Sequence, residues 1–360
     1  MNLEILGWQS FFSDHYRNLE QQGLSPARVI REQASMYIIY GETGESAAEL
    51  SGRFKYNSSD RNAFPSVGDW VAAAVRPDEG RAVIHALVPR RNCFSRKVPG
   101  DHTDEQVLAA NVDVAFIVNG LDGDYNPRRI ERYLTLARDC RVAPVILLNK
   151  ADLCSDPDRL IADLQTVTGD LPIHLISALE NDGLEPLGQY LTTGRTAVLL
   201  GSSGVGKSTI INRLLGFERL RVRDVRASDS RGRHTTTWRE LIILPHGGMI
   251  IDTPGLREIQ LWADQDSLDA TFTDIEQLAA DCRFRDCTHR REPDCAVRQA
   301  AEEGRLDPER LKSYLKLRKE LRHLEIRQDQ RARLDDKARW KKLSKAIRRH
   351  NKSDPKRRFR

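Results

Sequence analysis

The sequence contains no apolar segment long enough to cross a membrane. A spanning helix needs about 18 or more consecutive apolar residues, and none of the 360 residues lies in such a run. The N-terminus, MNLEILGWQSFFSDHYRN, also lacks the basic start and apolar core of a secretory signal peptide. These two absences predict a protein of the cytoplasm that has no membrane partner.

Cysteine is scarce, and disulfide bonds are not expected. The chain has six Cys, but the cytoplasm is a reducing compartment in which disulfides rarely persist. Cys93, Cys140 and Cys154 are scattered along the sequence, and we expect them to be ordinary core or surface thiols. The other three lie together between residues 282 and 295, where another kind of site is expected.

The basic charge of the chain is concentrated at its C-terminal end. The formal net charge is +5, yet residues 305–360 alone hold 22 Lys+Arg and 8 Asp+Glu. The rest of the chain is therefore net acidic. A solvated helical face is one interpretation, but a surplus this large favours a polyanionic partner.

The first 90 residues predict a small β-barrel preceded by a helical extension. Residues 1–24 have a helical pattern, and residues 25–90 hold four or five short strand-like segments between turn residues. This spacing is typical of an OB-like fold. A polar, basic connector over residues 91–110 is expected to follow. The aromatic side chains of the barrel either fill its core or offer stacking surfaces to RNA; they are Tyr37, Tyr40, Phe54, Tyr56, Phe64 and Trp70.

The remaining chain predicts an α/β domain, a helical domain and a tail. Over residues 111–264, apolar strands such as VDVAFIVNG and PVILLN alternate with amphipathic helices, which indicates a mainly parallel sheet covered on both faces. Residues 265–328 read as mostly helical around a Cys/His cluster. A basic tail over residues 329–360 completes a multidomain α/β protein.

Residues 201–208, GSSGVGKS, fit the G-x-x-x-x-G-K-S pattern of a phosphate loop. An apolar strand precedes the motif and a helix follows it, which is the context that this loop requires. Its backbone amides and the helix N-terminus face phosphate oxygens. Lys207 is expected to reach the β- and γ-phosphates, and the Ser208 hydroxyl to ligate Mg²⁺. The residues predicted to bind nucleotide here are Gly201, Ser202, Ser203, Gly204, Val205, Gly206, Lys207, Ser208 and Thr209.

A base-reading motif, Asn149-Lys150-Ala151-Asp152, comes earlier in the chain and follows another apolar strand. The Asp152 carboxylate can accept hydrogen bonds from the two donors on the edge of guanine, which adenine lacks. Asn149 would brace the base and the loops, and the Lys150 stem would pack over the ring. A simple turn at the end of a strand is the alternative. Ser177-Ala178 is placed like a second guanine-contacting loop.

A third nucleotide motif, DTPG at residues 252–255, follows the strand that comes after the phosphate loop. Asp252 would hold a Mg²⁺-bound water, and the Gly255 amide would contact the γ-phosphate. The preceding segment RGRHTTT supplies a Thr to complete the Mg²⁺ shell and sense the γ-phosphate, as switch loops do. Thr236 is our assignment, although Thr235 and Thr237 stay open.

Cys282, Cys287, His289 and Cys295 form the pattern C-x4-C-x-H-x5-C. Three thiolates and one imidazole make a closed tetrahedral set of the kind that one structural Zn²⁺ requires. Unrelated buried cysteines or a disulfide are the alternatives. Basic side chains interleave with these ligands and either face phosphates or are solvated; they are Arg283, Arg285, Arg290 and Arg291.

The base motif precedes the phosphate loop, which is the reverse of the order in an ordinary small GTPase. This order, with GRHTTT ahead of DTPG and the Cys/His cluster behind, resembles the circularly permuted GTPases, and among them the ribosome small-subunit-dependent GTPase A family. The resemblance implies a GTP hydrolase that binds the small ribosomal subunit and its rRNA. It also implies that hydrolysis is coupled to late-stage subunit maturation and to release of the protein, which we expect to be a monomer.

Leu256 stands where many GTPases have a water-positioning Gln, so unassisted hydrolysis should be slow. The resemblance implies that the small subunit stimulates turnover. His234 is a candidate to orient the attacking water, or it is a loop histidine without a catalytic role. A rival hypothesis is an RNA-binding checkpoint protein that holds GTP as a ligand with negligible catalysis, and another is an ATP-dependent enzyme with a coincidental base motif.

Removal of residues 329–360 tests whether the basic tail contacts a polyanion. We expect the truncated protein to bind RNA more weakly and with a shallower dependence on salt, because fewer counterions are released when fewer cations meet phosphates. The measurement is RNA affinity as a function of salt concentration. An unchanged slope would mean that the tail is only solvated.

Overall fold

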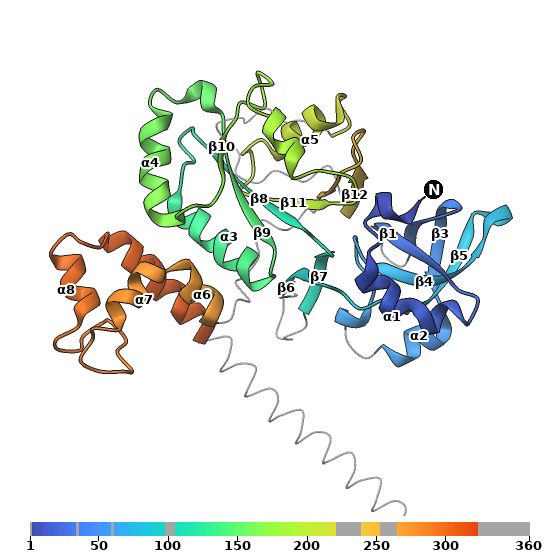
Figure 1. Cartoon of the computed structure of the whole chain (residues 1–360), viewed down its shortest axis with the longest axis horizontal. Coiled ribbons are helices and arrows are strands. Elements are labelled where there is room, and N and C mark those ends of the chain that lie inside the picture. Colours follow the sequence, from blue (N-terminus) through green and yellow to red (C-terminus); the bar gives the residue numbers. More distant parts are fainter. Residues whose placement is uncertain are drawn as a thin grey trace, which may run out of the picture.

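The computed structural model of the protein describes residues 2–33, 36–58, 61–97, 105–220, 239–252 and 265–322. Figure 1 shows a β-barrel, a central sheet flanked by helices, and a group of helices beside α3. This arrangement has the fold class predicted from the sequence. No helix in these ranges is long and apolar enough to span a bilayer.

Five strands close into a barrel in the N-terminal part. They are β1 (Ser25–Gln33), β2 (Met36–Gly41), β3 (Gly44–Leu50), β4 (Trp70–Arg76) and β5 (Arg81–Leu87). Their order is β1-β2-β3-β5-β4, and β4 pairs with β1 to close the ring. The β3–β5 pairing is parallel and the others are antiparallel. This is a five-stranded barrel of the OB-like kind.

The N-terminal extension packs on the outer face of β4, in a cluster separate from the barrel core. It contains η1 (Leu3–Leu6) and α1 (Ser10–Glu20). Leu6 and Phe12 are fully buried against Trp70. Of the aromatic side chains considered for RNA stacking, Tyr37 is buried in the barrel core and Trp70 is buried beneath the extension, whereas Tyr56 is 90% exposed.

The segment after β3 turns into a short helix, which the sequence did not predict. α2 (Gly52–Asn57) begins where the Ser51 hydroxyl accepts a hydrogen bond from the Phe54 amide at 3.2 Å. A serine cap of this kind favours a helix start over an extended strand. Two short 3-10 turns complete the barrel, η2 (Arg61–Ala63) and η3 (Pro77–Glu79).

A two-stranded sheet occupies the segment that was predicted to be a polar connector. β6 (Cys93–Lys97) pairs antiparallel with β7 (Glu105–Ala110). Phe94 and Leu108 are fully buried, so the hairpin contributes to the core. The sequence analysis missed it because β6 carries a single aromatic side chain among polar and basic ones, which is a weak strand signal.

The central sheet has the order β10-β9-β8-β11-β13-β12, in which only β12 runs antiparallel to its neighbour β13. Its strands are β8 (Val114–Gly120), β9 (Ala143–Asn149), β10 (Ile173–Leu175), β11 (Thr196–Leu200), β12 (Arg239–Ile243) and β13 (Met249–Asp252). Helices α3 and α4 bury their apolar sides against one face and α5 against the other. The helical elements are α3 (Pro127–Asp139), η4 (Ala151–Leu153), α4 (Pro157–Thr168), η5 (Glu185–Gln189) and α5 (Lys207–Leu215).

The barrel and the central sheet are continuous because β12 pairs with β1. Arg31 lies opposite Glu240, and Glu32 lies opposite Arg239. Arg31 Nε donates to Glu240 at 3.2 Å, and Arg239 donates to Glu32 at 3.0 Å. Arg219 adds a third ion pair by donating to Glu240 at 2.8 Å. Opposite charges directly across a strand pair favour this one register.

One buried guanidinium joins the extension, the barrel and the central domain. Arg28 is 1% exposed and donates to the backbone carbonyls of Leu6, Gly68 and Asn111. Burial lowers the pKa of Arg28 to about 10, although the charge of Asp113 opposes this effect. The three carbonyls come from three separate parts of the chain, so their positions depend on Arg28.

The C-terminal helices dock on α3. They are α6 (Gln265–Thr271), α7 (Thr273–Ala279), α8 (Ala296–Glu302) and a further helix that includes residues 308–322. At the centre of the junction, Arg310 forms ion pairs with the fully buried Glu131 at 2.8 Å and with Asp274 at 2.6 Å. Arg128 pairs with the same Glu131 at 2.6 Å. The two arginines thus compensate a carboxylate that has no access to water.

Substitution Arg28→Met should destabilise the whole protein. The variant leaves the buried carbonyls of Leu6 and Asn111 without this donor, whereas Gly68 keeps a hydrogen bond from the Asn111 side chain at 3.1 Å. A buried unsatisfied polar group costs about 1–3 kcal/mol. We expect a loss of about 3 kcal/mol or more in the free energy of unfolding, measured by urea denaturation. The control is Arg17→Met, since Arg17 makes only an exposed ion pair with Asp14, and its effect should stay below about 0.5 kcal/mol. Equal stability of the two variants would contradict the assigned role.

Candidate nucleotide and metal sites

The loops that hold the predicted nucleotide motifs meet at one edge of the central sheet. Strands β8, β9, β10, β11 and β13 run parallel to one another, so their carboxyl ends lie at the same edge. Residues 149–152 follow β9, residues 177–178 follow β10, and residues 201–208 follow β11. Asp252 ends β13. Ligands of open α/β sheets bind at this edge.

The predicted phosphate loop connects β11 to α5. Gly206 has a φ of 100°, and a Cβ at this position would lie 2.1 Å from Asn149 Nδ2, so only glycine is compatible with the loop. The Lys207 ammonium donates to two carbonyls of the loop, at 2.7 and 2.5 Å. Helix α5 begins at Lys207, with Ser208 and Thr209 in its first turn. Its free amides therefore point toward the loop.

Asn149 connects the base motif to two other loops of the site. Its Nδ2 donates to the Val205 carbonyl of the phosphate loop at 2.8 Å, and its Oδ1 accepts from the Ala178 amide at 3.0 Å. Asn149 is only 2% exposed. Three motifs from separate parts of the sequence thus meet at one side chain. The Ala178 amide of the predicted second guanine-contacting loop is thus engaged by Asn149.

The carboxylate expected to read guanine is held by a hydroxyl. Ser177 Oγ donates to Asp152 Oδ1 at 2.6 Å. The loop that carries Ser177 is held in turn by Arg213 of α5, which donates to the carbonyls of Ala178 at 3.0 Å and Leu179 at 2.7 Å. Sequence reasoning missed Arg213, because a basic residue within an amphipathic helix carries no signal of such a contact.

Two carboxylates that were not predicted also contact the motifs. Asp122 pairs with Lys150, and Asp124 accepts a hydrogen bond from the Ser202 hydroxyl and pairs with Arg129 at 2.6 Å. Desolvation acts to raise the pKa of Asp124, but hydrogen bonds from Arg129 and Ser202 outweigh it and lower the pKa below its usual value. The available signal was a Gly- and Asp-rich loop directly after β8, at the same edge as the motifs.

Several predicted residues lie outside the described ranges. They are His234, the three threonines Thr235, Thr236 and Thr237, and Gly255 with Leu256. Asp252 is described, and it lies opposite Glu240 in the β12–β13 pair.

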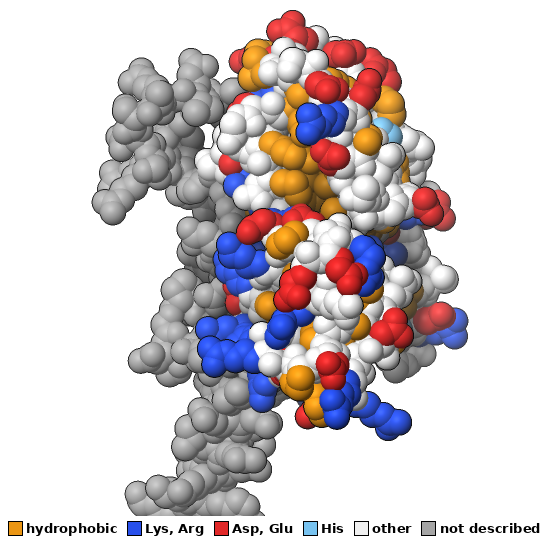
Figure 2. Space-filling view, turned by 90° about the vertical axis from the view of Figure 1, so that its left-hand side faces the viewer, with side chains coloured by type: hydrophobic (Ala, Val, Ile, Leu, Met, Phe, Trp, Pro, Cys, Tyr) orange, Lys and Arg blue, Asp and Glu red, His pale blue; other side chains and the backbone are white. Residues whose placement is uncertain are grey.

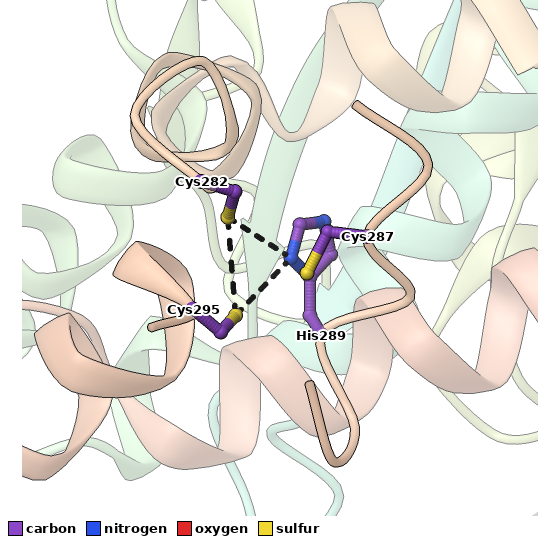
Figure 3. A group of neighbouring side chains, drawn as sticks. All are labelled: Cys282, Cys287, His289 and Cys295. Carbon is purple, nitrogen blue, oxygen red and sulfur yellow. Dashed lines mark hydrogen bonds between the residues drawn. The ribbon is translucent and has the colours of Figure 1, made fainter. Parts of the chain in front are cut away.

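The four predicted metal ligands converge on one point, as Figure 3 shows. Their ligand atoms all lie within 4.8 Å of one another. Cys282 Sγ lies 3.9 Å from Cys295 Sγ, and His289 Nδ1 lies 3.7 and 3.5 Å from these two sulfurs. Burial raises the pKa of the Cys287 thiol to about 11, and the neighbouring thiols add to this effect. A Cys3His set in this arrangement could bind a metal ion, which would favour the thiolate forms.

The loop that carries the ligands is held by Glu292. Its carboxylate accepts hydrogen bonds from the Thr288 hydroxyl and from the amides of Thr288, Arg290 and Arg291. These bonds, the one from the Thr288 hydroxyl first, lower the pKa of Glu292 well below its usual range. The loop geometry is thereby fixed by the protein's own side chains.

The arginines around the metal ligands point to solvent. Arg283, Arg285, Arg290 and Arg291 are all exposed. Figure 2 shows basic side chains gathered over the C-terminal helices, among some acidic ones, whereas the upper part of the same face, over α4, carries mainly acidic side chains. The C-terminal part thus has the more basic surface of this face.

Comparisons with known proteins agree with the site. The family model described as RsgA GTPase matches residues 87–262. A "Small ribosomal subunit biogenesis GTPase RsgA" of Opitutus terrae is 46% identical over 352 residues, covering 95% of this chain and 96% of the relative. A protein with the same description from Syntrophotalea carbinolica is 44% identical over 351 residues, again covering 95% and 96%.

Solved structures show the same architecture. The crystal structure of YjeQ from Thermotoga maritima is similar, with a TM-score of 0.61 and 28% identity, over 83% of this chain and 98% of that chain. The structure of YloQ, described as a circularly permuted GTPase, has a TM-score of 0.59 and 25% identity, over 83% of this chain and 96% of that chain. Motif order, fold and relatives over nearly the full length lead to one conclusion: the chain belongs to the RsgA GTPase family and has a circularly permuted GTPase fold.

Proposed function

We propose that the protein is a GTPase that binds the small ribosomal subunit and couples GTP hydrolysis to late-stage subunit maturation and to its own release. The observation that carries this proposal is the meeting of three permuted motifs at Asn149, which holds the phosphate loop and the loop after β10 at hydrogen-bond distance. The names of the relatives add the small subunit as the partner.

In this proposal the base lies over the edge formed by β9 and β10. Asp152 accepts from the two donors of guanine, and its hydrogen bond from Ser177 at 2.6 Å fixes the orientation of the carboxylate. Adenine lacks this pair of donors and would leave the side of the carboxylate that faces the base unpaired, which accounts for selectivity. Asn149, Lys150 and Ala151 form the rest of the base loop, with Ser177 and Ala178 on its other side.

The phosphates lie over residues 201–209 at the N-terminus of α5. Lys207 neutralises charge on the β- and γ-phosphates, and Mg²⁺ is bound through Ser208. We assign Asp252, Gly255 and Thr236 to the γ-phosphate and the metal, and His234 to the attacking water. Catalysis then consists mainly of positioning and charge stabilisation, as is general for phosphoryl transfer.

We propose that the metal at Cys282, Cys287, His289 and Cys295 is one structural Zn²⁺. Zinc bonds to sulfur are about 2.3 Å long, so the edge between two sulfurs of a tetrahedron is about 3.8 Å. The observed separation of Cys282 Sγ and Cys295 Sγ is 3.9 Å. All four ligands come from the protein, which suits a structural role.

We also propose how the parts bind the subunit. Residues 25–90 form the barrel, residues 91–110 the connector, residues 111–264 the GTPase domain and residues 265–328 the metal domain. The exposed arginines around the metal ligands contact rRNA phosphates, and the basic tail at residues 329–360 contacts them too. We expect a monomer that works in the cytoplasm.

The proposed activity is tested by measuring GTP hydrolysis with added ribosomal subunits. We expect small subunits to raise the rate and large subunits to leave it unchanged. Lys207→Ala should lower the stimulated rate about 100-fold or more, because a charge that stabilises the transition state is lost. The control Arg159→Ala removes an exposed cation of α4 and should keep the wild-type rate. A lack of stimulation by small subunits would sink the proposal.

Metal analysis tests the zinc assignment. We expect about one zinc per chain by mass spectrometry, and Cys295→Ser should lose most of it and lower the melting temperature, because metal binding stabilises the fold. Cys93→Ser is the matched control, since Cys93 lies outside the cluster, and it should keep both the metal and the melting temperature. Iron or no metal in the wild-type protein would contradict the assignment.

A further inference from the structure

The loop of residues 121–126, between β8 and α3, belongs to none of the predicted motifs, yet it contacts two of them. Its Asp122 carboxylate pairs with Lys150 of the base motif. Its Asp124 carboxylate accepts from the Ser202 hydroxyl of the phosphate loop. The loop therefore connects the two halves of the nucleotide site, the base motif through Lys150 and the phosphate loop through Ser202.

We propose that Asp122 and Asp124 are positioning residues of the nucleotide site, which set the Lys150 side chain and the phosphate loop for binding. The inference deepens the proposed function and rests on it, because it concerns the same guanine-nucleotide site. Neither residue is assigned to contact the nucleotide. Asp122 acts through Lys150 and Asp124 acts through Ser202, and both of these neighbours are assigned to nucleotide binding.

The loop is rigid enough for this role because both of its ends are fixed. Asn119 at the end of β8 is 2% exposed, and its side chain exchanges two hydrogen bonds with the backbone of Asn126, at 3.4 and 3.3 Å. The Leu121 amide donates to the Asn149 carbonyl at 2.8 Å, which ties the loop to the base motif. The Tyr125 amide closes a turn onto the Asp122 carbonyl at 3.1 Å.

Asp124 is held by a charge from α3. Arg129 donates to the same oxygen, Oδ2, that accepts from Ser202. Arg129 lies in the first turn of α3, where its amide donates to the capping side chain of Asn126 at 3.1 Å. Because Arg129 belongs to α3, the helix holds the Asp124 carboxylate in place, and this carboxylate in turn holds the Ser202 hydroxyl.

Asp122 holds Lys150 in a similar way. One carboxylate oxygen pairs with the Lys150 ammonium, and the other accepts from the Asp124 amide at 3.2 Å. A Cβ at Gly120 would lie 2.7 Å from this second oxygen, so a side chain at residue 120 would push the carboxylate out of this position. Lys150 itself has a φ of 64°, a backbone conformation that fixes the direction of its stem.

The charges of the cluster allow a clear distinction between positioning and electrostatic repulsion of the phosphates. Asp122 and Asp124 are matched by Lys150 and Arg129, so the four groups are neutral together. A carboxylate beside a phosphate loop would by itself repel phosphate. If Asp124 acted only through its charge, its removal would tighten GDP binding. If it positions the loop, its removal must weaken binding.

The test is a double-mutant cycle on GDP affinity in the full-length chain, measured by titration calorimetry. We expect Asp124→Ala and Ser202→Ala each to raise the Kd for GDP about 10-fold, the effect of losing one charge-assisted hydrogen bond. The double variant should also be weaker by about 10-fold and not by about 100-fold, because both changes remove the same contact. Asp122→Ala and Lys150→Ala should be non-additive in the same way.

Two further variants keep the result interpretable. Asp124→Asn retains an oxygen that accepts from Ser202, and it should recover most of the affinity lost in Asp124→Ala. Asp170→Asn removes an exposed carboxylate far along the chain from the loop and should bind GDP like the wild type. A thermal melt of each variant identifies any that fail to fold.

The possible failures can be told apart. If the wild-type chain does not bind GDP in preference to ADP, the proposed function itself fails. If the wild type binds GDP but Asp124→Ala binds equally well or more tightly, only the present inference is overturned. Additive losses in the double variant overturn it as well, since the two side chains would then act independently.

Discussion

A guanidinium that is shut off from water must find acceptors inside the protein, and Arg28 meets this constraint where the barrel joins the central sheet. Its acceptors are carbonyls of the N-terminal extension, of the turn before β4 and of the residue after β7, and Met249 of β13 lies 3.5 Å away. A shift of any one of these segments would leave the buried Arg28 guanidinium without one of its acceptors, at a cost of about 2 kcal/mol or more. The relative position of the barrel and the nucleotide edge depends on this contact.

The junction with the C-terminal helices also depends on a buried charge, but this charge is negative. There the buried group is the carboxylate of Glu131, and the compensating cations are Arg128 and Arg310. Removing one cation is costly, because the buried carboxylate is then left without full compensation. Moving the C-terminal helices away from α3 would have the same effect. Both neighbours of the GTPase domain are therefore attached by contacts that tolerate one geometry. Apolar packing around Phe272 also stabilises the junction, but it constrains the geometry less than the ion pairs do.

What could be predicted from the sequence was local. The phosphate loop, the base motif and the metal ligands each lie within a short stretch, and their chemistry fixes spacing over a few residues. The strands and helices of the central domain were also predictable, because apolar runs alternate with amphipathic segments. The family assignment followed from the order of these motifs.

The rest depends on partners that are distant in the sequence. Asp124 meets Ser202 across 78 residues, and Arg310 meets Glu131 across 179. Nothing in the sequence around Arg28 predicts that this strand residue is buried, because its three carbonyl acceptors lie in other parts of the chain. The hairpin of β6 and β7 was missed for a related reason, since the side chains that bury Phe94 come from elsewhere in the chain. Such contacts leave no periodic or motif signal.

The pairing of β12 with β1 has a mechanical consequence. Side chains alternate between the two faces of a strand, so a slip of one residue would carry Arg239 and Glu240 to the wrong faces and break the ion pairs with Glu32 and Arg31 together. A force along β12 would therefore have to break both ion pairs at once before this strand could slide along β1.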